Sequence, residues 1–152
     1  MRTRLVALAA LAVVIALAIA VAPAFGDDGG RPFTTTLTGA AEVPGPGDPD
    51  ASGMAFLRLN PGQGEVCVDI SWADVNGEVF ASHIHVGAAT EAGPVVITLF
   101  TGSFGGSGTV SQCVEADRDL LRAILQSPEN YYVNLHSRPD FPGGAIRGQL
   151  SK

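Results

Sequence analysis

Short runs of alternating apolar and polar residues follow one another from Phe33 onward, separated by Gly, Pro and Asn. In Glu65–Trp72, Val66, Val68 and Ile70 alternate with other residues, which is the two-residue period of a half-buried strand. The other runs have similar lengths and turn-forming boundaries. We predict strands at Phe33–Leu37, Met54–Leu59, Glu65–Trp72, Ala81–Val86, Pro94–Phe100, Thr109–Val114, Tyr131–His136 and Ala145–Leu150.

One segment, Asp117 to Gln126, has the period of a helix instead. Its apolar residues recur at spacings that place them on one helical face. Asp117 is suited to cap the first turn, and Pro128 follows where it would end the helix. The apolar residues are Leu120, Leu121, Ile124 and Leu125.

This pattern predicts an all-β fold, an antiparallel β-sandwich or Greek-key barrel of about eight short strands with one short helix, Asp117–Gln126. A parallel sheet would need helices between most of the strands, and the pattern predicts only one helix.

The first residues have the three parts of a secretory signal peptide. Arg2 and Arg4 precede an apolar run from Leu5 to Val21, and Ala22-Pro23-Ala24 gives a small-residue exit. We predict a signal peptide at residues 1–24, cleaved after Ala24, and a secreted, extracytoplasmic protein. The alternative is a retained membrane anchor, because the apolar run is near the lower limit for a spanning helix.

Residues 25–32 are rich in Gly and Asp, which is typical of a flexible tether. The predicted organisation is therefore a signal peptide at 1–24, a tether at 25–32 and one β domain at 33–152.

The net charge of the chain argues against nucleic acids and anionic lipids as partners. Without Arg2 and Arg4, the chain has 7 basic and 15 acidic residues, a net charge of −8. Nucleic acids and anionic lipids bind basic surfaces, so we expect no nucleic acid partner, and membrane contact only if the signal sequence stays as an anchor.

The two cysteines, Cys67 and Cys113, both lie in predicted strands. Cys67 alternates with Val66 and Val68 and so belongs to the polar side of its strand. An even number of cysteines in an oxidising compartment favours a disulfide, here across the outside of the sheet. Two buried free thiols are the alternative.

All three histidines lie in two predicted strands. His83 and His85 are two residues apart and share a face, and His136 shares its face with Tyr132 and Asn134. If the two strands are neighbours, the three imidazoles converge on one patch.

Three imidazoles suit zinc or copper and leave a position open for water or a fourth ligand. Glu42 is a candidate for that fourth ligand or for a carboxylate behind the ligands. The alternatives are a hydrogen-bonded histidine cluster that binds no metal, and an ordinary loop carboxylate at position 42.

Motifs of known catalytic sites are absent from the sequence. It contains no G-x-S-x-G, no G-x-x-x-x-G-K and no G-x-G-x-x-G. Asp48, Asp50 and Ser52 match the start of an EF-hand loop, but the twelfth position is Leu59 where calcium needs a glutamate. We therefore expect a protein that is not an enzyme.

Two longer motifs resemble the CHRD (chordin-like) domain family. They are His83-Ile84-His85-Val86-Gly87 leading into Gly93-Pro94-Val95-Val96, and Tyr131-Tyr132-Val133-Asn134-Leu135-His136 leading into Pro142-Gly143-Gly144-Ala145-Ile146-Arg147-Gly148-Gln149-Leu150. Leu37-Thr38-Gly39 with Glu42-Val43-Pro44 is similar to the family's opening motif, so the resemblance spans residues 33–150.

The resemblance implies an extracellular β domain and places the family's recurrent histidines at His83, His85 and His136. The chain departs from the family at Gly45, where a second proline is usual, and at Ala145, where a glutamate often precedes Ile-Arg-Gly. This chain therefore lacks that carboxylate beside Arg147.

Two functions follow as hypotheses. The first is a non-enzymatic extracellular binding or structural module with an unknown partner. The second is a mononuclear copper- or zinc-binding protein that uses the three histidines.

Overall fold

In the computed structural model, which describes residues 30–152, eight antiparallel strands form one sheet with the neighbour order β5-β4-β7-β8-β1-β2-β3-β6. The predicted signal peptide and residues 25–29 of the predicted tether lie outside the described residues. The strands are β1 (Arg31–Thr38), β2 (Ser52–Asn60), β3 (Glu65–Ala73), β4 (Glu78–Val86), β5 (Val95–Phe104), β6 (Gly108–Glu115), β7 (Tyr131–Arg138) and β8 (Ile146–Gln149). The helices are α1 (Arg118–Gln126) and two single 3-10 turns, Gly39–Ala41 and Pro128–Asn130.

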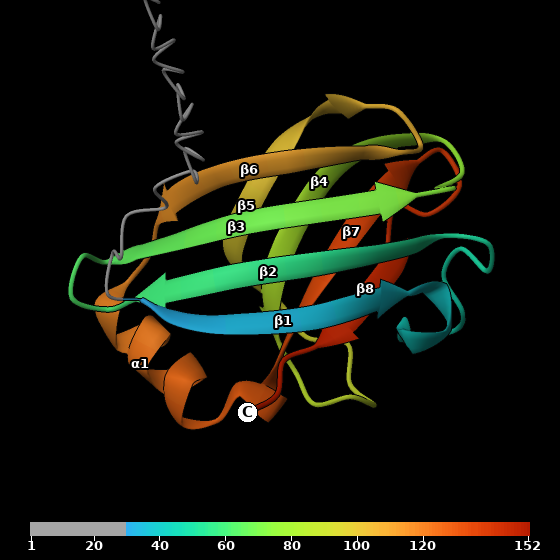
Figure 1. Cartoon of the computed structure of the whole chain (residues 1–152). Coiled ribbons are helices and arrows are strands. Elements are labelled where there is room, and N and C mark those ends of the chain that lie inside the picture. The colour runs from blue at the N-terminus through green and yellow to red at the C-terminus, as the bar shows by residue number, and fades with distance from the viewer. Residues whose placement is uncertain (1–29) are drawn as a thin grey trace, which may run out of the picture.

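The sheet folds over on itself into a nearly closed barrel. Figure 1 shows β6, β3, β2 and β1 in one layer and β5, β4, β7 and β8 behind them. The layers are joined where Thr38 of β1 pairs with Arg147 of β8. The predicted all-β fold with one short helix is confirmed.

Strand β5, at one end of the sheet, meets both β3 and the other end strand, β6, through side chains. The ring of Trp72 lies 5.8 Å from the rings of both Phe100 and Phe104, and its indole N–H donates to the Gly105 carbonyl at 3.0 Å. The side chain of Gln112 in β6 donates to the Leu99 carbonyl in β5. These contacts hold together the side of the barrel where the sheet ends.

The core follows the predicted alternation. Val66, Val68, Ile70 and Trp72 all point into the barrel and are buried, as the period of two predicts for β3. Their partners across the sheet in β2, such as Leu57 opposite Val68, are also buried. Burial of these rows is the main source of the domain's stability.

Helix α1 lies at the end of the barrel where β1 begins (Figure 1). Asp117 caps it, as predicted: one carboxylate oxygen accepts the backbone N–H groups of Asp119 and Leu120 at 2.9 and 2.8 Å. Leu121 and Ile124 are fully buried and close this end of the core.

Most strand boundaries differ from the prediction by one to four residues, and β4 begins three residues early, at Glu78. Strand β1 begins at Arg31, two residues early, so the end of the predicted tether is in the sheet. Pro32 pairs with Arg58 of β2, and a proline is tolerated there because the other side of β1 meets β8 only at Thr38. Strand β5 extends to Phe104, well beyond the predicted end at Phe100.

Asp48, which the sequence excluded as an EF-hand ligand, is buried and hydrogen-bonds to the turn before β4. Its carboxylate accepts the backbone N–H of Asn76 at 2.6 Å and the Asn76 side chain at 3.0 Å. Its hydrogen bonds therefore fasten the turn before β4 to the segment before β2.

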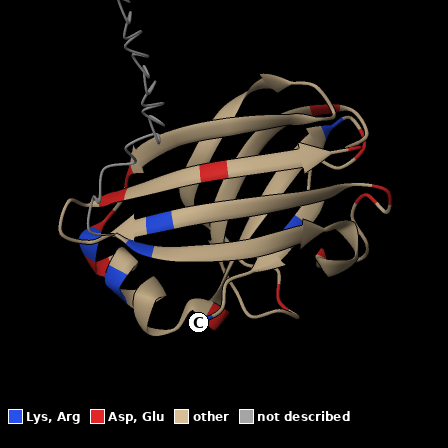
Figure 2. Ribbon diagram, in the orientation of Figure 1, with Lys and Arg blue, Asp and Glu red and all other residues tan. Residues whose placement is uncertain are grey.

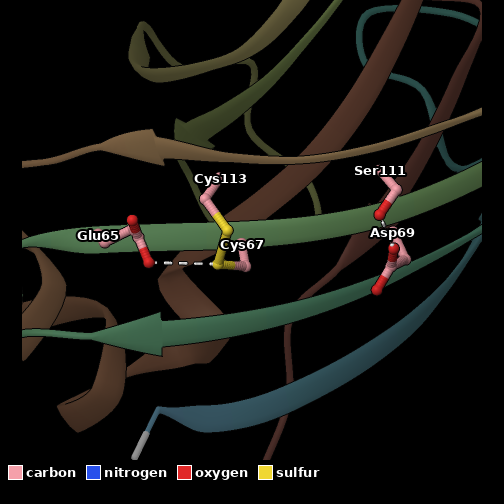
Figure 3. Close-up of a disulfide and its surroundings, with 5 residues drawn as sticks. All are labelled: Glu65, Cys67, Asp69, Ser111 and Cys113. Carbon is pink, nitrogen blue, oxygen red and sulfur yellow. Dashed lines mark hydrogen bonds between the residues drawn. A yellow bond between two sulfur atoms is a disulfide. The ribbon is translucent and has the colours of Figure 1, made fainter. Parts of the chain in front are cut away.

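Cys67 and Cys113 form the predicted disulfide, with an S–S distance of 1.99 Å. The two residues are direct partners in the β3–β6 register, and Figure 3 shows the bridge on the outside of the sheet. The Glu65 carboxylate lies 3.3 Å from the Cys67 sulfur. Because both sulfurs are in the disulfide, neither is a thiolate ligand for a metal.

The charged residues of the described chain are scattered. Figure 2 shows arginines toward the end of the sheet beside α1, with acidic residues among them, so that end has mixed charge. Among residues 30–152, no helix is both long and apolar enough to cross a membrane.

Candidate metal centre

Strands β4 and β7 are neighbours, and this pairing brings the three histidines together. Within the register, His83 lies opposite Asn134 and His85 opposite Tyr132. Ile84 and Val133 point into the core, so the histidines occupy the other face of the sheet. The condition set by the sequence, that the two strands be adjacent, is met.

The imidazoles are close enough to share one ion. One ring nitrogen from each of His83, His85 and His136 lies within 4.8 Å of the others. His83 Nδ1 and His136 Nε2 are 3.0 Å apart. Two nitrogens bound to one tetrahedral zinc at about 2.0–2.1 Å stand roughly 3.4 Å apart, so a small movement of the rings would admit the ion.

Backbone carbonyls fix which nitrogen of two histidines faces the cluster. His85 Nδ1 is 2.8 Å from the Gly93 carbonyl, and His136 Nδ1 is 3.0 Å from the Pro142 carbonyl. A carbonyl only accepts, so each Nδ1 carries its proton and each Nε2 presents a lone pair. Histidine ligands of metals have this arrangement, with the outer nitrogen held by a hydrogen bond.

His85 Nε2 is the atom that a cluster without metal leaves unexplained. The side chain is 7% exposed, and Nε2 is buried with no hydrogen-bond partner among the described residues. The contact between His83 and His136 satisfies one nitrogen of each of those rings but does not involve His85. Buried polar atoms are rarely left unpaired, so His85 Nε2 is the strongest sign of a ligand.

The rings of His83 and His136 are held in their neutral state. Burial, with the neighbouring His136 and His85, lowers the pKa of His83 to about 4. Burial also lowers the pKa of His136, although its hydrogen bond to Pro142 opposes the shift. A metal binds neutral imidazole, so at neutral pH neither ring has to lose a charge first. His83, whose Nδ1 donates to His136 Nε2, only has to move its proton to Nε2.

The His85 ring is packed against a stack of two further side chains. The Tyr132 ring lies parallel to the His85 ring at 4.8 Å, and the Arg147 guanidinium lies 3.4 Å from the centre of the Tyr132 ring. Arg147 is 1% exposed and donates to the carbonyls of Ala88 and Glu91. The loop after β4 therefore covers this face of the sheet.

The sequence did not predict that Arg147 and Gln149 belong to the polar layer that surrounds the histidines on the outer face of the sheet. Both alternate with core residues in β8 and therefore share its outer face. The Gln149 side chain donates to the carbonyls of Gly87, Glu129 and Tyr131. The available signal was the strand pattern of β7, where Tyr132 and Asn134 share the face of His136.

Glu42 is buried in the same polar layer but is not one of the clustered ligands. Among the described residues, the group that could hold a metal on this face contains only the three histidines. The Glu42 carboxyl instead lies near Arg147, and it hydrogen-bonds with Asn134 and the Val43 backbone. Its burial outweighs these contacts and raises the pKa of Glu42 to about 7.

Comparison with known proteins gives a family. A family model described as the CHRD domain matches residues 33–150, which include the three histidines and both cysteines. No curated protein and no solved structure matches the chain.

Proposed function

The chain belongs to the CHRD domain family, and from this premise we propose that it is a secreted, non-enzymatic binding module whose ligand is one copper or zinc ion. In this proposal His83, His85 and His136 are the ligands, and a fourth position is left for water or for a group of a partner.

The single observation that carries the proposal is the buried, unpartnered Nε2 of His85 beside two other ring nitrogens. A cluster that only ties strands together would give each buried nitrogen a hydrogen-bond donor or acceptor. Nitrogen donors without carboxylate or thiolate favour zinc and copper over calcium and magnesium.

Export and the lack of activity rest on other observations. The predicted N-terminal signal sequence and the disulfide both suit an oxidising compartment. The non-enzymatic assignment rests on the missing catalytic motifs, and turnover in a broad hydrolase and redox screen would overturn it.

The test compares metal-induced stabilisation of the wild type with that of His85→Phe. The phenyl ring keeps the stack on Tyr132 but removes both nitrogens. An ion that binds only the folded state stabilises it by about 2.7 kcal/mol at a free concentration of 100 times Kd. We expect Zn²⁺ or Cu²⁺ to raise the Tm of the wild type and not that of the variant, and Mg²⁺ to raise neither.

If neither Zn²⁺ nor Cu²⁺ stabilises the wild type, or if His85→Phe is stabilised equally, the three histidines are a structural cluster. The module would then bind a ligand other than a metal.

A further inference from the structure

A cavity of about 240 Å³ lies between the segment after β1 and the loop that joins β7 to β8. Glu42 and Asp140 contribute its two acidic side chains, and the described lining contains no basic residue. The remaining wall is mostly proline, aromatic and glycine, including Pro44, Phe141 and Gly143. The cavity therefore combines apolar walls with negative charge.

Glu42 lines this cavity, and its carboxyl has an unused acceptor. The side chain is 8% exposed, and Oε1 is buried without a hydrogen-bond partner among the described residues. A Cβ at Gly144 would lie 2.5 Å from the carboxyl carbon and from Oε1, and one at Gly47 would lie 2.8 Å from Cγ. The carboxyl group thus occupies its place only because glycines flank it.

The nearest described cation does not use that acceptor. Arg147 attracts the carboxylate, but its guanidinium nitrogens donate to Ala88, Glu91 and Gln149 and form no ion pair with Glu42 within 4.0 Å. A buried carboxylate without full compensation is costly, and a donor with positive charge would relieve that cost.

We propose that this cavity binds a primary ammonium group on an aliphatic stem, with Glu42 Oε1 as its acceptor. The proline and phenylalanine walls fit the methylenes, and Asp140 adds negative charge. The shared chemistry is that of a lysine side chain of a partner and of a free alkylamine. None of the three histidines lines the cavity, so the proposal does not rest on metal binding.

Other ligands fit the acceptor less well. A guanidinium binds a carboxylate through two parallel hydrogen bonds, whereas Asn134 and the Val43 backbone already hydrogen-bond to this carboxyl. Calcium needs six to eight oxygen ligands, and this cavity offers two carboxylates. One free oxygen in an apolar recess matches the compact point charge of an ammonium.

The test follows amide chemical shifts of the full mature protein at about pH 8, because Glu42, with a pKa of about 7, is mostly ionised there. Chelator is present so that amines cannot bind a metal. The probes are n-butylamine for a free amine and Nα-acetyl-lysine amide for a lysine side chain, and n-butanol is the neutral control. We expect at least one of the two amines to cause saturable shifts, confined to residues 42–46 and 140–144. We expect n-butanol to bind more weakly by about 10-fold or more, because it cannot form the charge-assisted hydrogen bond.

Two variants change the cavity independently. Glu42→Gln keeps the shape and removes the charge, and should weaken amine binding by about 10-fold or more. Gly143→Leu adds bulk at the wall, where a new Cβ has no heavy atom within 4 Å, and should block binding even if Glu42→Gln fails to fold. Asp50→Asn removes an exposed charge outside the cavity and should leave binding unchanged.

Equal binding of n-butanol and n-butylamine, unchanged amine binding by Glu42→Gln or by Gly143→Leu, or the absence of saturable shifts in the two segments would each overturn the proposal. Preference for the lysine amide identifies a partner's side chain as the source, and preference for n-butylamine identifies free amines.

Discussion

His85 and Tyr132 share one backbone carbonyl as well as a stacking contact. His85 Nδ1 is 2.8 Å from the Gly93 carbonyl oxygen, and the Tyr132 hydroxyl lies 3.4 Å from the same oxygen. The Gly93 N–H in turn donates to the Tyr132 hydroxyl at 3.2 Å. The orientation of a candidate metal ligand is therefore set jointly by β7 and by the loop after β4.

Tyr132→Phe should weaken metal binding moderately. The substitution keeps the stack on His85 but removes the hydroxyl that holds Gly93, so the His85 ring is less well oriented. Loss of such outer contacts costs about 10- to 100-fold in metal affinity, and we expect the lower end because His85 keeps its own hydrogen bond. Competition against a chromogenic zinc chelator measures the affinity.

Tyr131→Phe is the matched control, since Tyr131 belongs to the core and not to the histidine face. Equal affinities for Tyr132→Phe and the wild type would show that the shared carbonyl does not position His85.

The sequence alone placed His83 and His85 on one face, but it placed His136 beside them only on the condition that the two strands are neighbours. His83 and His85 share a face because residues two apart always do so in a strand. The approach of His136 required β4 and β7 to pair across about fifty residues of sequence, and no local pattern specifies such a long-range pairing. The structure supplies that pairing.

The pH dependence of metal-free protein should reveal His83. The unfolded imidazole has a pKa of 6.5, and the folded one a pKa of about 4. Between these pH values the unfolded chain binds a proton that the folded protein does not, so this residue lowers the free energy of unfolding as the pH falls from 6.5 toward 4.

Denaturant midpoints with chelator present, for wild type and His83→Phe between pH 4 and 8, measure this contribution. We expect the stability of the wild type relative to the variant to decrease as the pH falls below 6.5. A difference that is constant across this range would contradict the buried, neutral His83.

Glu42 should act in the opposite direction. Its carboxyl has a pKa of about 7 in the folded protein against 4.5 when unfolded, so the folded protein holds an extra proton between these values. Its contribution is fully present below pH 4.5 and is lost as the pH rises through 7. Relative to the wild type, Glu42→Gln should therefore gain stability from pH 4.5 to 8.

The exposed Asp50→Asn is the control for Glu42→Gln and should show a nearly constant difference from the wild type. The same constancy in Glu42→Gln would mean that the carboxyl of Glu42 is solvated in the folded protein.

The disulfide should support the fold without affecting the histidine cluster. Its cysteines are 46 residues apart, and a loop of that length corresponds to about 3–4 kcal/mol on the chain-entropy model. The bond joins β3 to β6, whereas the histidines lie on β4 and β7. A Cys67→Ser/Cys113→Ser variant should lose roughly this stability in urea unfolding and keep its zinc affinity.

A large loss of zinc affinity in the folded double-serine variant would show that the two faces of the barrel are coupled. Unchanged stability would show that the disulfide does not lower the entropy of the unfolded chain as the chain-entropy model requires.

Glu42 and Arg147 show what local patterns could not supply. The sequence drew attention to Glu42 as a fourth ligand, because it is a carboxylate in a recognisable motif, but its place depends on Gly47 and Gly144 packing against it. Arg147 lies on the outer face of β8 and is buried only because the loop with Ala88 and Glu91 folds over it. Loop positions of this kind follow from the whole fold.

The disulfide and the helix were predictable because their signals are local or compositional. Asp117 has the residue type and position of an N-cap, and Cys67 lies on the outer side of a strand whose inner row is plainly apolar. Only the partner strand of β3 had to come from the structure.

The most direct test of the metal centre is X-ray absorption of the purified protein loaded with one equivalent of zinc. We predict a first shell with three imidazole nitrogens at about 2.0–2.1 Å and one oxygen ligand, and weaker imidazole scattering in His85→Phe, which keeps only two of the three rings. A stoichiometry below one, or a first shell dominated by oxygen without imidazole, would contradict a site built from His83, His85 and His136.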